Sequence, residues 1–109
     1  MYEPSKHDWN LFRERLPKWQ EAYMDKLNKE YITILSGEGV ASEKFWKLND
    51  RIKEDIKHPG VLIEPSRNKM IFDILELLKD GAVTKDDLEG FSEDFFEYLD
   101  YFINEYINE

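Results

Sequence analysis

Residues 8–36 read DWNLFRERLPKWQEAYMDKLNKEYITILS, and their apolar side chains decide the fold. Large apolar residues recur in this stretch at spacings of three and four, the period that places side chains on one face of an α-helix. Pro17 interrupts the stripe, because a proline removes a backbone hydrogen bond and crowds the preceding turn. The sequence therefore predicts one long helix, roughly residues 8–36, kinked at Pro17, with Asp8 or Ser5 as its N-cap. The stripe comprises Trp9, Phe12, Leu16, Trp19, Tyr23, Leu27, Tyr31 and Ile34.

A second helix is predicted over residues 42–57, after the glycines of SGEG at 36–39 have ended the first. Ser42 is its expected cap, and the short link predicts that the two helices pair antiparallel. Trp46 lies off the apolar edge of this helix, so we expect it to pack under the first helix or over the end of the core, or otherwise to anchor an interface. We expect the second helix to lie over the core by a narrow stripe of Phe45, Leu48, Ile52 and Ile56.

The second half of the chain predicts two more helices. Residues 66–81, SRNKMIFDILELLKDG, are apolar around most of a helical circumference, which predicts a third, central helix closed by Gly81. Thr84 and Asp87 form a capping-box-like pair for one short turn, and Ser92 caps the fourth helix. The fold class is therefore all-α, a small bundle of four main helices forming a single helical domain over residues 1–109. The core face of the fourth helix is expected to hold Phe95, Phe96, Leu99, Phe102, Ile103, Tyr106 and Ile107.

The net charge of −9 is confined to the second half of the chain. Residues 1–60 contain 11 Lys and Arg against 11 Asp and Glu, whereas residues 61–109 contain 4 against 13. An acidic surface disfavours direct binding to nucleic acid or anionic lipid, and it favours a protein partner with a basic patch. The simpler interpretation is that the charge serves solubility alone.

The composition also limits the compartment and the chemistry. The chain has no cysteine, so disulfides and thiolate chemistry are excluded. Its N-terminal residues lack an apolar segment, and runs such as YITIL are far shorter than the ~20 residues that span a bilayer. We therefore expect a cytoplasmic protein with no signal peptide and no membrane contact.

No motif in the sequence predicts catalysis. HExxH, GxSxG, P-loop and GxGxxG patterns are all missing. The segment DGAVTKDDL at 80–88 resembles the second half of an EF-hand loop, but the alignment places Leu78 at a ligand position, and leucine cannot bind calcium. His58 and Glu54 are four residues apart, but two ligands do not form a metal site, so we expect His58 to cap the end of the second helix. The sequence predicts no enzyme, no cofactor and no metal.

The last helix carries the candidate binding face. Tyr98 and Tyr101 fall outside its core arc, among the carboxylates of Asp94, Glu97 and Glu105. A tyrosine beside carboxylates can stack on an arginine while the acids pair with the same cation. We predict that these five residues contact a protein partner; the alternative is that the tyrosines cover a neighbouring loop or the second helix.

Three segments resemble a family of small uncharacterised bacterial proteins, some of which carry the label "multidrug transporter". They are DWNLFRERLPKWQEAYMDKLNKEY at 8–31, ASEKFWKLNDRIKEDIKHPGV at 41–61 and DLEGFSEDF at 87–95. The resemblance implies a small helical fold and no assigned activity. The transporter label has no support in a chain without a membrane-spanning segment.

Three hypotheses for function follow. The first is a non-enzymatic protein-binding module, a small regulator or adaptor that uses the acidic and aromatic face. The second is an acidic mimic of nucleic acid that inhibits a nuclease of a restriction or CRISPR system, with the concentrated charge in its favour. The third is a homodimeric structural protein joined through Phe96, Ile103 and Ile107 of the last helix.

Overall fold

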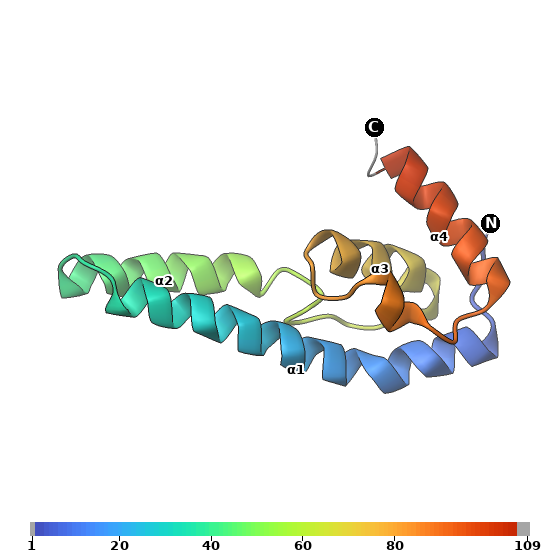
Figure 1. The fold of residues 1–109 in the computed structure, drawn as a ribbon, viewed down its shortest axis with the longest axis horizontal. Coiled ribbons are helices and arrows are strands. Elements are labelled where there is room, and N and C mark those ends of the chain that lie inside the picture. The colour runs from blue at the N-terminus through green and yellow to red at the C-terminus, as the bar shows by residue number, and fades with distance from the viewer. Residues whose placement is uncertain (1, 107–109) are drawn as a thin grey trace.

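The computed structural model of the protein describes residues 2–106, and every regular element in that part of the chain is helical. The helix α1 runs the length of the molecule, with α2 beside one half of it and α3 and α4 over the other half (Figure 1). The molecule is elongated, with extents of 52 × 31 × 22 Å. The prediction of an all-α fold with four main helices is confirmed. These are α1 (Lys6–Ser36), α2 (Ala41–Asp55), α3 (Met70–Lys79) and α4 (Glu93–Tyr106), with the short 3₁₀ helices η1 (Arg67–Lys69) and η2 (Lys85–Leu88).

The N-cap of α1 is Ser5. Its hydroxyl accepts a hydrogen bond from the Asp8 amide at 3.1 Å, so the alternative that Asp8 caps the helix is wrong. The Asp8 side chain lies inside the first turn and is fully buried. The helix continues through Pro17 to Ser36, and a kink at Pro17 stays a prediction.

The core lies between the first half of α1 and the later elements. The predicted stripe of α1 supplies Phe12, Leu16 and Trp19, and α4 supplies Phe95 and Leu99, all of them buried. Burying each large side chain stabilises the fold by about 1.5–3 kcal/mol before entropy is subtracted. From α3 and the segment after it come Met70, Ile71, Ile74, Leu75, Leu77, Val83, Leu88 and Phe91.

The predicted apolar circumference of α3 is only partly buried. Phe72 is 48% exposed, although its ring contacts that of Phe102 at 5.1 Å between centroids. The central position of α3 stays a prediction. On α4, Phe96, Phe102 and Ile103 pack partly buried against the core. The side chain of Tyr106, and Ile107, lie outside the described part of the structure.

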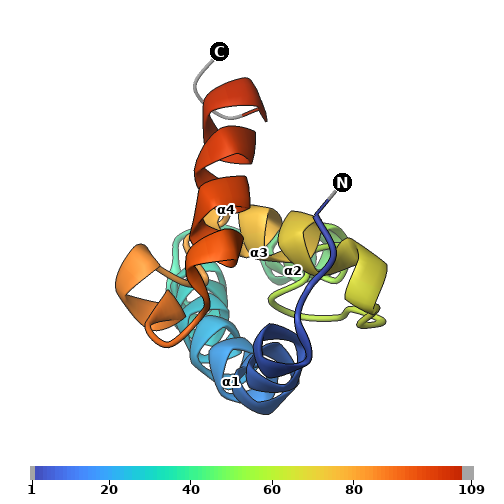
Figure 2. The ribbon, with the colours of Figure 1, turned by 90° about the vertical axis from the view of Figure 1, so that its right-hand side faces the viewer.

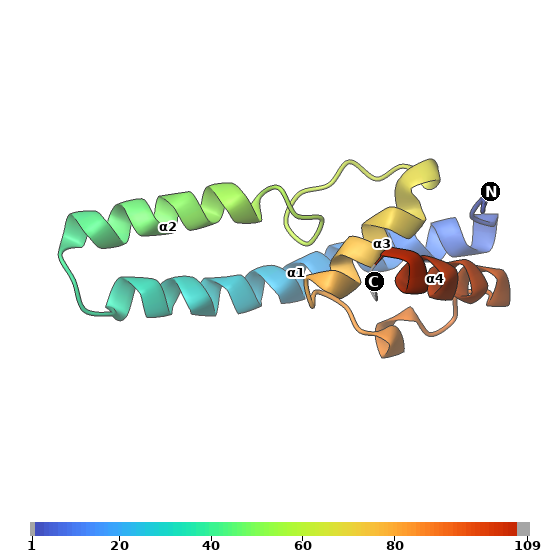
Figure 3. The ribbon, with the colours of Figure 1, turned by 90° about the horizontal axis from the view of Figure 1, so that it is seen from above.

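The second half of α1 and α2 form an antiparallel hairpin, as predicted (Figures 1 and 3). The Tyr31 hydroxyl of α1 donates to an Asp55 carboxylate oxygen of α2 at 2.6 Å. Arg51 pairs with Asp55 at 3.0 Å and with Glu30 at 2.7 Å, so one polar cluster joins the two helices. The N-cap of α2 is Val40, so the predicted Ser42 cap is wrong.

The apolar stripe of α2 does not lie over the core. Phe45, Ile52 and Ile56 are 63%, 36% and 42% exposed, because α2 packs on the half of α1 that α3 and α4 do not reach (Figure 3). Trp46 is 60% exposed, with its ring edge-on to Phe45 at 5.1 Å. The predictions that this stripe and Trp46 are covered within the chain are both wrong.

The predicted stops and caps of the second half are confirmed. Gly81 adopts a φ of 74°, a left-handed conformation that favours glycine, directly after α3. Thr84 and Asp87 form a capping box, in which the Thr84 amide donates to the Asp87 carboxylate at 2.7 Å. Ser92 accepts from the Phe95 amide at 3.2 Å, which caps the first turn of α4.

Candidate protein-binding face

The helix α4 rises away from the rest of the molecule (Figure 2). Its first half supplies the fully buried Phe95 and Leu99, and in its second half Phe102 and Ile103 pack partly buried against the core. A buried carboxylate fixes where α4 begins. Asp8 of α1 accepts hydrogen bonds from the Ser92 amide at 2.9 Å and from the Ser92 hydroxyl at 2.6 Å. Because the same hydroxyl caps α4, the first turn of α1 sets the position of the α4 N-terminus.

The five predicted contact residues lie on α4 as a partly exposed row. Asp94, Glu97 and Glu105 are exposed, Tyr101 is 56% exposed and Tyr98 is half-buried. Glu97, Tyr98 and Tyr101 border a hollow of about 320 Å³. Asp94 and Glu105 stand one helical turn to either side of it. We call these five residues the acidic–aromatic face.

Tyr2 packs against this face, a contact that no pattern in the sequence predicts. Its ring lies 4.7 Å from that of Tyr98, tilted by 44°, and its hydroxyl donates to Asp8 at 3.3 Å. Burial, and then the Asp8 carboxylate, raise the pKa of Tyr2. Tyr98 therefore covers the N-terminal segment before α1, which agrees with the alternative that it covers a neighbouring loop, while Tyr101 stays 56% exposed.

The charge of α4 leaves the face able to attract a cation. The helix sequence EDFFEYLDYFINEY contains five acids and no lysine or arginine. Asp100 lies 3.5 Å from Lys85, but both side chains are more than half exposed, and such pairs contribute little. Among the residues that the structure describes, Asp94, Glu97 and Glu105 form no ion pair, so the face combines open carboxylates with an accessible aromatic ring, the two features that hold a guanidinium group.

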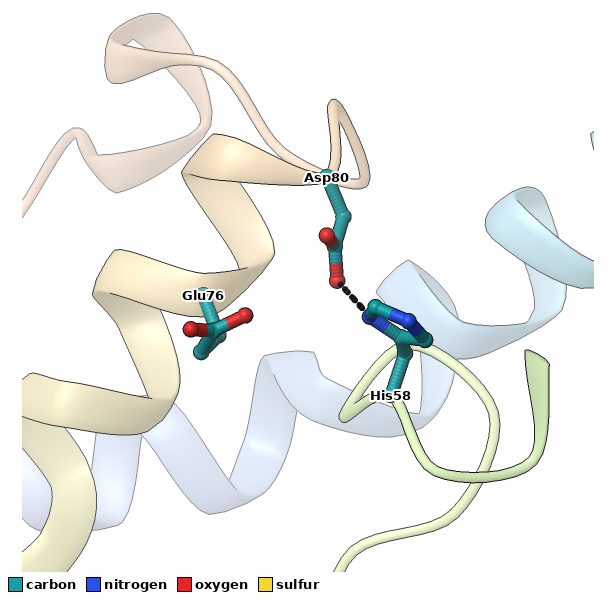
Figure 4. Close-up of side chains that lie close together, drawn as sticks. All are labelled: His58, Glu76 and Asp80. Atoms are coloured by element: carbon teal, nitrogen blue, oxygen red, sulfur yellow. Dashed lines mark hydrogen bonds and ion pairs between the residues drawn. The ribbon is translucent and has the colours of Figure 1, made fainter. Parts of the chain in front are cut away.

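Three potential metal ligands lie close together where the turn after α2 meets the C-terminal half of α3. His58, Glu76 and Asp80 bring one ligand atom each within 4.8 Å of the others (Figure 4). The His58 Nδ1 atom lies 2.7 Å from the Asp80 carboxylate, which is hydrogen-bond contact. Two ligand atoms on one tetrahedral zinc, at ~2.1 Å each, would lie roughly 3.4 Å apart. The geometry is thus that of a pair joining the turn after α2 to the end of α3, and the expectation of no metal stays a prediction.

His58 also takes part in the turn that follows α2. Its amide donates to the Asp55 carbonyl at 3.1 Å, in the turn that follows α2. The C-cap of α2 is Ile56, so the prediction that His58 caps this helix is wrong; His58 lies in the turn that follows the cap. Its side-chain partner Asp80, 22 residues later, had no signal in the sequence.

Asp73 is a buried acid with one oxygen that lacks a hydrogen-bond partner among the described residues. The sequence places it on the polar arc of α3, but it is only 9% exposed, and among the described residues its Oδ2 atom has no hydrogen-bond partner. Burial raises the pKa of its carboxyl group, against the opposing effect of Lys69. A buried, unpaired carboxylate lowers the stability of a fold.

Replacing Asp73 with asparagine is expected to stabilise the protein at neutral pH by about 1 kcal/mol. The pKa of Asp73 is higher in the folded state than in the unfolded state, so the folded wild type keeps the Asp73 proton to a higher pH. The free energy of unfolding of the wild type therefore falls as pH rises from the unfolded pKa to the folded pKa. The gain should therefore vanish at pH values below the ordinary carboxyl pKa of 3.8. Urea unfolding at acidic and neutral pH measures both values, and a variant destabilised equally at both would contradict the assignment.

Comparison of the chain with protein families, curated proteins and solved structures found no match. The resemblance to a bacterial family therefore stays a prediction. Among residues 2–106, no helix combines the length and the apolar character needed to cross a membrane. Ideas about function consequently rest on the side chains of this chain alone.

Proposed function

We propose that the protein is a non-enzymatic protein-binding module, a small regulator or adaptor, that holds a basic segment of its partner on the acidic–aromatic face. The observation that carries this proposal is the hollow beside Tyr101, whose ring stays 56% exposed between carboxylates. Aromatic residues with this exposure are enriched at protein interfaces. The anchored start of α4 keeps the face in a fixed orientation, which lowers the entropy lost on binding.

Arginine is the side chain that suits this face best. Its guanidinium group can lie over the Tyr101 ring while its N–H groups bond to the Glu97 carboxylate. A lysine offers a compact charge without the planar surface for stacking, so it should bind more weakly. Asp94 and Glu105, one turn to each side, would attract further basic residues of the same segment.

Tyr101→Arg is expected to weaken binding of an arginine-rich peptide by about tenfold or more, because it removes the ring and places a like charge beside the ligand. A fluorescently labelled arginine-rich peptide and a lysine-rich peptide of equal length serve as probes, titrated with the protein and read by anisotropy. The arginine peptide should bind the wild type more tightly than the lysine peptide does.

Leu62→Arg provides the matched control, because Leu62 is 65% exposed and lies outside α4. This variant changes the net charge by the same amount and should bind the arginine peptide as the wild type does. If Tyr101→Arg and Leu62→Arg weaken binding equally, net charge alone attracts the peptide, and the acidic–aromatic face is not the site.

Mimicry of nucleic acid is the second candidate, supported by the confinement of the −9 charge to residues 61–109. A mimic must occupy a basic groove through many exposed charges, so its binding should fall steeply as salt is added. On α4 the acids alternate with aromatic residues, a pattern that suits an arginine stacked on Tyr101 better than it suits a row of phosphate-like charges. Capture of a nuclease that is lost at moderate salt, and that is insensitive to Tyr101→Arg, would favour mimicry over the adaptor.

The third candidate is a homodimer through α4, whose predicted contact residues expose only part of their apolar surface. Phe96 and Ile103 are already partly buried against the core. Ile107 lies outside the described residues. Loss of a dimer on Phe96→Ser would support this interface.

A further inference from the structure

One broad face of the α1–α2 hairpin is apolar and uncovered. Between the helices runs a groove of about 180 Å³ whose walls include Met24 and Tyr31 of α1 and Ile52 and Ile56 of α2. With 100° per residue in each helix, Leu35 of α1 and Phe45 of α2 fall on this same side. We call this surface the groove face of the hairpin.

The opposite face of the hairpin is charged. Helical geometry places Lys44, Lys47 and Arg51 of α2 on that side, together with Lys26 and Glu30 of α1. The first half of α1 turns its buried stripe toward the same side, where α3 and α4 pack. The body of the molecule therefore does not cover the groove face, and the apolar residues of the hairpin collect on the side that remains open.

The groove face and its two rims together expose an apolar area slightly above that of the largest patch on an ordinary monomer. Exposed fractions between 36% and 63% imply on the order of 600–700 Å² of apolar side chain. The largest apolar patch on a typical monomer covers roughly 300–600 Å². A stable interface buries about 800 Å² from each partner, which this face and its polar rim together can supply. Leu35, Phe45, Ile52 and Ile56 lie on the face itself, and Ile32 and Trp46 lie at its α1 and α2 rims.

The charges at the rim of the groove face fit a second copy of the same face. Helical geometry puts Glu21 and Asp25 along the α1 rim, and Lys53 and Lys57 along the α2 rim. A two-fold axis parallel to the hairpin would lay α1 over α2 of the other copy, so that Glu21 and Asp25 meet Lys53 and Lys57 at both rims. Within one copy Asp25 pairs with Lys29 at 3.1 Å and Lys57 with Glu54 at 3.3 Å, both in exposed contacts that contribute little and that an interface can replace. Residues 25–57 contain seven lysines and arginines and seven acids, so two hairpins meet without net repulsion.

We propose that the groove faces of two copies pack together into an intermolecular four-helix bundle. Phe45, Ile52 and Ile56 form the apolar centre, and the acidic and basic rims fix the parallel arrangement of the two hairpins. The acidic–aromatic faces stay outside this interface, so the dimer presents two binding faces. This dimer differs from one formed through α4, because it uses neither Phe96 nor Ile103.

Sedimentation equilibrium over a concentration series tests the dimer. The wild type should show twice the mass of the chain, and Phe45→Glu should shift the dimer dissociation constant by roughly a hundredfold or more, because a two-fold interface contains Phe45 twice. Trp46→Glu, at the edge of the same face, should act in the same direction. Both side chains are at least 60% exposed, so circular dichroism should show the helical content of the wild type.

Leu62→Glu is the control, since it introduces the same charge at an exposed apolar residue outside the hairpin, and it should leave the dimer intact. A wild type that stays monomeric at millimolar concentration would overturn the proposal. So would a dimer that survives both Phe45→Glu and Trp46→Glu, or one that is broken instead by Phe96→Ser on α4.

Discussion

Asp8→Ala is expected to destabilise the protein by about 3 kcal/mol. The carboxylate is fully buried and accepts from both the amide and the hydroxyl of Ser92. Hydrogen bonds to a charged group contribute about 1.5–3 kcal/mol each, and removing one partner leaves the other without compensation. Thermal or urea unfolding followed by circular dichroism measures the change.

The consequence should extend from stability to the α4 face. Without Asp8, the Ser92 amide loses its acceptor and Tyr2 loses the partner of its hydroxyl. The first turn of α4 should then exchange its amide hydrogens faster than the rest of the core. Hydrogen exchange at Phe95, whose amide depends on the Ser92 cap, reports this directly.

Two variants control for simpler explanations. Asp8→Asn keeps one acceptor oxygen and should lose about half as much stability as Asp8→Ala. Asp100→Ala removes an exposed acid from α4 itself and should stay within about 0.5 kcal/mol of the wild type. Equal losses for Asp8→Ala and Asp100→Ala would show that the Asp8–Ser92 contact does not hold α4.

Local sequence signals were sufficient for the helices and most of their ends. The stripe from Phe12 to Leu27 is buried, Gly81 ends α3, and the Thr84–Asp87 capping box forms as predicted. Each of these features depends on residues within one or two turns of each other, where helical period and backbone conformation act directly. The helical wheel also placed Tyr101 outside the core arc, but it left open whether a loop or the second helix covers this side chain, which the structure shows to be 56% exposed.

Contacts between distant residues carried no comparable signal. Asp8 meets Ser92 across 84 residues, and Tyr2 meets Tyr98 across 96. Ser5 and Asp8 both satisfy the preference for an N-cap, and the choice between them follows from the position of Ser92, which no local rule includes. The partners of a buried polar residue depend on the packing of helices, so this part of the candidate site required the structure.

The stripe of α2 shows a different limit. The pattern of Phe45, Ile52 and Ile56 correctly predicts an amphipathic helix, but periodicity states only that one side is apolar. It does not state what covers that side. The sequence interpretation assumed the chain's own core, and the structure leaves the stripe open because the hairpin extends beyond α3 and α4.

Asp55→Ala is expected to destabilise the protein by about 2 kcal/mol, because it removes the acceptor at the centre of the hairpin cluster. Asp55 is 8% exposed, accepts from the Tyr31 hydroxyl at 2.6 Å and pairs with Arg51 at 3.0 Å. Arg51 keeps Glu30 as a partner, which limits the loss. Asp50→Ala, on the exposed side of the same helix, is the matched control and should change the free energy of unfolding by less than about 0.5 kcal/mol.

The pH dependence of the same cluster separates the Tyr31 hydrogen bond from general packing. Burial and the hydrogen bond to Asp55 raise the pKa of Tyr31 from 10.0 to about 12. Because the folded pKa is the higher one, the stabilisation is complete below pH 10 and is lost as pH rises toward 12. Tyr31→Phe has no proton to lose, so its stability should decline less over this interval than that of the wild type. If both proteins decline in parallel, the Tyr31 hydroxyl does not join α1 to α2, and the hairpin is held by apolar contacts and Arg51 alone.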